Sequence, residues 1–119
     1  MDVRIDSVTH RTENQIRIVY YDDGFEEKIA LFDEEREAYI NNDTGFFIKG
    51  IEELEHSYRK QHNELLGFLE EHDSVELWSE WTTDTVKEMA EEINGISDHI
   101  KRNRIVLKAM SEGVSGEPS

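Results

Sequence analysis

Cysteine is absent from this chain of 119 residues. Its absence excludes disulfide bonds, thiolate metal sites and thiol catalysis. No apolar run approaches the roughly 18 residues that span a membrane. The first residues show neither the apolar stretch nor the small-residue cleavage site of a signal peptide. We therefore expect a cytoplasmic protein without membrane contacts, in the host cytoplasm if a phage encodes it.

Basic residues are scarce. Lysine and arginine number 13 against 28 aspartates and glutamates, and the formal net charge is −15. Such a charge repels nucleic-acid phosphates, so we expect no direct nucleic-acid partner. Salt adaptation is an alternative explanation of the charge. The surplus of glutamate over aspartate and the frequent isoleucines disfavour it.

The sequence also lacks the motifs of common catalytic and metal sites. There is no Gly-x-Ser-x-Gly, no glycine-rich phosphate loop and no His-Glu-x-x-His. Glu53 and His56 have the spacing of a helical ligand pair, but no second pair matches them in the last helix. The many other carboxylates lie mostly off the apolar stripes and indicate solvated faces. We therefore predict a non-enzymatic protein without a metal or a cofactor.

The first third of the chain alternates with period two, which is typical of strands with one buried face. One such run contains Val3, Ile5 and Val8, the next Ile16 to Tyr20, and the third Phe25 to Leu31. Asp22-Asp23-Gly24 predicts a tight hairpin between the last two runs, because Asp-Gly accepts positive φ. A turn of unassigned type is expected near residues 12–14. The prediction is a three-stranded antiparallel β-meander over residues 2–32.

Two readings remain open for residues 33–48. Asp33 is a candidate cap for a short helix over 33–40, which we favour. Phe46, Phe47 and Ile48 are then either the beginning of the next helix or a strand paired with residues 37–40.

From Ile51 onward the apolar spacing changes to three and four, as in amphipathic helices. The stripes predict helices over 48–72 and 84–111 that form an antiparallel hairpin. In this pairing, Leu65 faces Ile93 and paired positions sum to roughly 158. A capping box of Asp73 with Glu76 predicts a short tip helix over 74–81, and Thr85 with Glu88 is a candidate cap for the last helix.

Two glycines lie inside the predicted helices. Gly67 and Gly95 indicate either close helix packing or bending. The fold class is therefore α+β: a single domain over 1–112, with the meander followed by the hairpin and its tip helix. Residues 113–119 read as a flexible tail.

The predicted end of the hairpin carries the strongest functional signal. Ten acidic residues and one base, Lys87, lie between Glu64 and Glu92, and both tryptophans of the chain lie among them. Tryptophan is a leading hot-spot residue in interfaces, although packing of at least one of the two on the hairpin is the simpler expectation. The candidate partner-binding residues are Glu70, Glu71, Asp73, Glu76, Trp78, Glu80, Trp81, Asp84 and Glu88.

The leading hypothesis is a binding protein that inhibits or modulates a partner protein with a basic surface. Carboxylates spaced along helices substitute for phosphates opposite a Lys/Arg groove. In this character the chain resembles phage or mobile-element inhibitors that imitate DNA charge, such as anti-restriction and anti-CRISPR proteins. The alternative is a structural or assembly protein that oligomerises through its helical hairpin, like a coiled coil. A homodimer is expected in either case, with Leu65, Phe68, Met89 and Ile93 at the oligomer interface.

Overall fold

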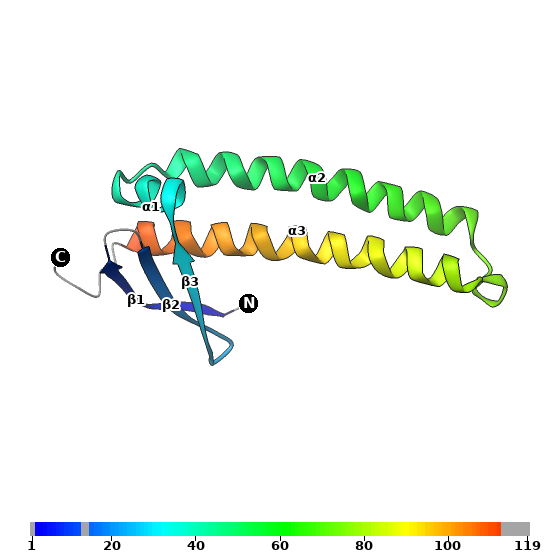
Figure 1. Cartoon of the computed structure of the whole chain (residues 1–119), viewed down its shortest axis with the longest axis horizontal. Coiled ribbons are helices and arrows are strands. Elements are labelled where there is room, and N and C mark those ends of the chain that lie inside the picture. Colours follow the sequence, from blue (N-terminus) through cyan, green and yellow to red (C-terminus); the bar gives the residue numbers. More distant parts are fainter. Residues whose placement is uncertain (1, 13–14, 113–119) are drawn as a thin grey trace. The chain divides into compact units, whose positions relative to one another are not determined.

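The structure, a computed structural model, describes residues 2–12 and 15–112. Its elements are β1 (Val3–Thr12), β2 (Gln15–Asp22), β3 (Phe25–Leu31), α1 (Asp33–Ile40), α2 (Thr44–Glu71), the 3-10 helix η1 (Val75–Leu77) and α3 (Glu80–Glu112) (Figure 1). The predicted α+β fold is confirmed. The turn predicted at 12–14 falls mostly, and the tail at 113–119 wholly, outside the described residues.

Two compact units make up the chain. One consists of Met1–Gly50 with Arg102–Ser119, and the other of Ile51–Lys101. The first unit contains the sheet, α1, the beginning of α2 and the end of α3. The second contains the rest of α2 and α3 and the connection between them.

The sheet is antiparallel in the order β1-β2-β3. Asp23 and Gly24 both have positive φ, 52° and 89°, so the predicted hairpin turn is confirmed. β2 and β3 pair without a register shift, whereas the pairing of β1 with β2 has two, between Ile5 and Ser7 and between His10 and Thr12. The first of these irregularities explains how Ile5 and Val8, an odd number of residues apart, are both buried.

One face of the sheet forms the core of the first unit. Its fully buried side chains include Ile16, Ile18 and Leu31 from the sheet, Phe47 from α2 and Val106 from α3. Each such burial stabilises the fold by about 1.5–3 kcal/mol. Phe25 lies on the same face of β3 as Leu31, but it is 73% exposed beside the turn between β2 and β3. The period-two pattern does not distinguish covered from uncovered strand ends.

Backbone geometry defines the connection from α1 to α2. The N–H of Asp43 donates to the carbonyl of Ala38 at 2.8 Å, and that of Asn42 to Tyr39 at 3.1 Å. Together with the φ of 55° at Asn42, these bonds form a Schellman-type helix end. The carboxylate of Asp43 then accepts the N–H of Phe46 at 3.3 Å, which caps α2. Residues 46–48 thus lie in the first turns of α2, and the alternative of a strand pair is wrong.

The predicted cap of α1 is also wrong. Asp33 is the first residue of α1 and has a φ of 49°, and no side chain caps this helix. The carbonyl of Phe32 instead accepts the N–H groups of Glu35 and Arg36 at 3.1 and 3.3 Å.

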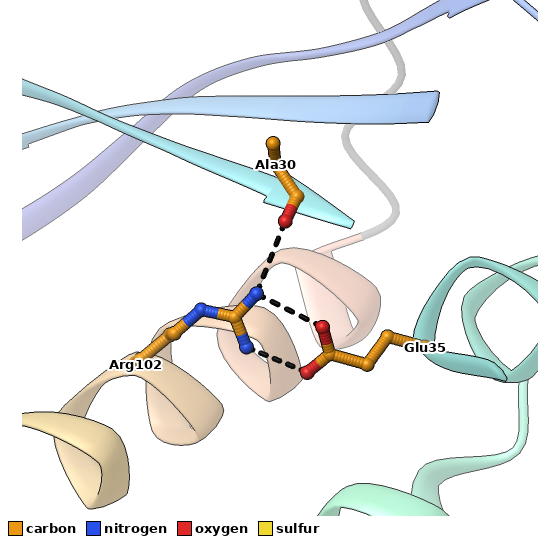
Figure 2. Close-up of polar contacts among 3 residues, drawn as sticks. All are labelled: Ala30, Glu35 and Arg102. Carbon is orange, nitrogen blue, oxygen red and sulfur yellow. Dashed lines mark hydrogen bonds and ion pairs between the residues drawn. The ribbon is translucent and has the colours of Figure 1, made fainter. Parts of the chain in front are cut away.

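An arginine at the beginning of the α3 segment in the first unit ties three elements together. Both terminal nitrogens of Arg102 contact the carboxylate of Glu35 on α1, at 2.6 and 3.0 Å, and one also donates to the carbonyl of Ala30 on β3 at 3.0 Å (Figure 2). Bidentate pairing is the strong geometry for arginine and carboxylate. Nearby, a Cβ added to Gly50 would lie 3.1 Å from the Asn103 side chain, so α2 and α3 approach closely here.

The last helices differ from expectation in their boundaries. α2 begins at Thr44 rather than 48, and α3 at Glu80 rather than 84. The tip helix predicted over 74–81 is a three-residue 3-10 helix, because Trp78 is extended, with a ψ of 130°, and stops it. The expected Asp73–Glu76 capping box is missing, since Ser74 is the N-cap residue and no side chain caps η1.

The register inside the hairpin also differs from the predicted pairing. The amide of Gln61 donates to Glu92, whereas the pairing rule places residue 97 opposite Gln61. The ring of Phe68 lies 6.0 Å from that of Trp81, whereas the rule places residue 90 there. Apolar stripes with heptad spacing permit such shifts of about one turn or more, because each shift again aligns apolar rows.

Candidate functional site

The connection between α2 and α3 is held by the indole of Trp78. Its Nε1–H donates to the carbonyl of His72 at 2.7 Å. The imidazole of His72 stacks on Phe68 with 4.2 Å between ring centroids. The backbone N–H of His72 donates to the Phe68 carbonyl at 3.1 Å, and its ring Nδ1 lies 2.9 Å from the same carbonyl oxygen. Trp78 is therefore a half-buried anchor that satisfies a helix-end carbonyl of α2.

The first turn of α3 is capped by Ser79. Its hydroxyl accepts the N–H of Thr82 at 3.1 Å and lies 3.0 Å from the Thr82 hydroxyl, and Thr82 is buried. Thr85, the predicted cap, instead donates its hydroxyl proton to the carbonyl of Trp81 at 2.8 Å inside the helix. α3 therefore begins early enough to include Trp81.

Three apolar side chains project from the resulting hairpin end. Leu77 is 84% exposed, Val75 66% and Trp81 65%. The ring of Trp81 is tilted by 56° to that of Phe68, with 6.0 Å between the two centroids. Single exposed apolar residues are ordinary, but three within seven residues of one connection form a cluster. We call Val75, Leu77 and Trp81 the apolar tip.

Carboxylates flank the apolar tip on both sides in the chain. Between residues 70 and 84 there is no lysine or arginine. All seven acidic candidates are exposed: Glu70, Glu71, Asp73, Glu76, Glu80, Asp84 and Glu88. The acidic groups attract cationic side chains, and the apolar tip offers the surface that an interface core requires.

The two tryptophans do not share a face, because no helix includes both. Trp78 folds back onto His72, and Trp81 stays exposed on α3. Val75 and Leu77 are not among the candidate residues that the sequence indicates. The sequence nevertheless contains a sign of their exposure. Two apolar residues in an isolated Val-x-Leu between acidic residues do not continue the apolar stripe of either helix.

The four residues expected at an oligomer interface are at least half-buried within the single chain. Ile93 is buried, and Leu65, Phe68 and Met89 are half-buried. Leu66, the neighbour of Leu65, is 46% exposed instead. Neither hairpin glycine marks a close approach between α2 and α3, because a Cβ on Gly67 or Gly95 would meet nothing within 4 Å.

The described residues contain neither a cluster of metal-ligating side chains nor a helix that could span a membrane. Over residues 2–12 and 15–112, no group of three or more histidines and carboxylates is placed to hold a metal ion. Within the same residues, no helix combines the length and apolarity that crossing a membrane requires.

No protein-family model matches the chain, and no curated protein or solved structure shows significant similarity to it.

Proposed function

We propose that this protein binds a partner protein with a basic surface through the hairpin end and thereby inhibits or modulates that partner. The observation that carries the proposal is the apolar tip, Val75, Leu77 and Trp81, set among exposed carboxylates. Interfaces combine a desolvated apolar centre with a polar rim, and tryptophan is enriched among their energetic anchors.

Charge decides the kind of partner. The net charge of −15 gives every approaching basic surface a long-range attraction. Six carboxylates and no lysine or arginine lie between residues 70 and 84, so the attraction is concentrated beside the apolar tip. Carboxylates at this density occupy a Lys/Arg groove as phosphates do, which supports imitation of nucleic-acid charge as the mode of inhibition.

A pull-down comparison tests the proposal. Tagged wild-type chain, Trp81→Ala with Leu77→Ala, and the control Phe25→Ala are compared on lysate of the host cell. Phe25 is a matched control because it is an exposed aromatic residue, 73% exposed, on the other compact unit. We expect a basic protein to be retained by the wild type and the control, and lost from the tip double variant.

Elution then tests the role of charge. Raising salt from about 50 mM to about 200 mM, or adding short duplex DNA, should release the retained protein, because both weaken or compete with ionic contacts. Retention that is equal for wild type and tip variant would refute the tip as the binding surface. Retention that neither salt nor DNA alters would refute imitation of nucleic-acid charge.

A further inference from the structure

The outer face of α2 in the second unit carries a stripe whose charge reverses along its length. Between residues 59 and 70 the exposed residues at helical spacing on this face are Arg59, His62, Asn63, Leu66 and Glu70, and the row continues towards the beginning of α2 with the exposed His56 and Glu52. Between Arg59 and Glu70 the charge changes from positive to negative towards the tip. Leu66, at the midpoint, is the apolar residue of the stripe.

Beside Leu66 lies Gly67, which is exposed and has no side chain. A Cβ added to Gly67 would meet nothing within 4 Å, so no contact inside the chain requires glycine at this position. Glycine in a helix interior is costly relative to alanine. A close approach from outside the chain is the arrangement that makes use of this open space.

We propose that two copies of the chain associate through this stripe, with the α2 helices antiparallel about a twofold axis at Leu66. In an isologous contact of this kind each residue meets its complement in the other copy. Leu66 then packs on Gly67 of the second copy. Glu70 of one copy lies between Arg59 and His62 of the other, so the basic half of each stripe faces the acidic half of its mate.

The charged side chains of Arg59 and Glu70 can form these ion pairs with a second copy of the chain. Among the described residues, Arg59 and Glu70 take part in no ion pair within the chain. The second copy is therefore favoured over an unrelated protein, because one surface supplies both halves of the charge pattern. With one leucine per copy at its centre, this is a small contact of the weak, reversible class.

This inference does not depend on the proposed function. It concerns the outer face of α2, and the apolar tip of Val75, Leu77 and Trp81 takes no part in it. Its test contains no partner protein, so failure of either proposal is seen separately.

Sedimentation of the full chain measures the association. Between about 10 µM and about 1 mM at low salt, the average mass should rise from 14.0 kDa towards that of a dimer. Arg59→Glu should weaken the association about tenfold, because the twofold counts each pair twice. Combining Arg59→Glu with Glu70→Arg should restore it. Lys87→Glu, the same charge change at an exposed position of α3, should leave it unchanged.

Gly67→Gln gives a second and sharper measurement. Glutamine favours helix over glycine and has room here within the chain, so thermal stability should rise or stay equal while association is lost. Gly95→Gln is the matched control, since its Cβ also meets nothing within 4 Å. A mass of 14.0 kDa throughout the range would overturn the proposal. Equal losses for both glycine variants, or no restoration by the charge exchange, would also overturn it.

Discussion

Arg102 and Glu35 form a two-pronged ion pair across 67 residues of sequence, with nitrogen–oxygen distances of 2.6 and 3.0 Å. The same guanidinium reaches the carbonyl of Ala30, so a single side chain links β3, α1 and α3. We expect Arg102→Lys to destabilise the fold by about 1 kcal/mol, because lysine keeps the charge and loses the planar fork. Both side chains are about a third exposed, which keeps the expected loss below that of a buried pair.

A double-mutant cycle measures that relationship directly. Urea unfolding of Arg102→Lys, Glu35→Gln and the double variant should give a coupling energy of about 1 kcal/mol. The matched comparison is Lys108 with Glu112, an exposed pair at 3.0 Å on one helix, for which about 0.3–0.5 kcal/mol is expected. Equal coupling in the two pairs would mean that the fork geometry adds nothing.

The two tryptophans should differ in their contribution to stability. Trp78→Phe removes the hydrogen bond to the His72 carbonyl and should cost about 1 kcal/mol. Trp81→Phe changes an exposed ring and should cost less than about 0.5 kcal/mol. Thermal unfolding followed by circular dichroism checks both. If Trp81→Phe were the more destabilising, its ring would be part of the packed structure rather than of a binding surface.

Asn42 holds the left-handed position after α1, with a φ of 55°. Asn42→Gly should therefore be nearly neutral, whereas Asn42→Ala should cost about 1 kcal/mol, because a Cβ disfavours that conformation. Asn41 has an ordinary φ of −83° and provides the control, at which alanine should change little. Urea midpoints of the three variants separate conformational strain from the loss of an asparagine side chain.

Tyr39 gives the stability a dependence on alkaline pH. Burial of this side chain raises the pKa of its hydroxyl above 10.0. Above pH 10 the unfolded chain therefore loses the phenolic proton first, and the stability falls as pH rises towards the folded pKa. Below that range both states keep the proton, and Tyr39 contributes no pH dependence. Comparing urea midpoints of the wild type and Tyr39→Phe from about pH 9 to about pH 11.5 isolates this contribution, which the variant should lack.

Local signals in the sequence predicted most of the fold. The sheet follows from the alternation in the first third of the chain and from the Asp22-Asp23-Gly24 turn. Both signals are local in sequence, so the sheet could be predicted without knowledge of distant contacts. The change to helical spacing after Ile51 identified α2 and α3 in the same way. The residues at which the helices begin were harder to predict from the sequence. Asp33, Ser79 and Thr85 are all good capping residues, but of these three only Ser79 acts as a cap.

The candidate site was predicted in position but not in form. The acidic residues around the two tryptophans indicated that a binding surface lies at the hairpin end. This location follows from their clustering in the sequence, without knowledge of side-chain contacts. Which indole is anchored depends on whether Trp78 reaches the His72 carbonyl, a contact across six residues that no spacing rule anticipates. The hairpin register was equally inaccessible, because Gln61 meeting Glu92 is one of several alignments that keep apolar rows together.

The placement of both tryptophans in one connection gives the molecule a built-in optical reporter. The chain has only these two indoles, Trp78 and Trp81, so all of its tryptophan emission arises from the hairpin end. Trp81 is exposed among carboxylates, so iodide should quench it poorly by charge repulsion, whereas neutral acrylamide should quench it well. A ligand that covers this end should shift the emission to shorter wavelength, and no dye or label is needed to follow its binding.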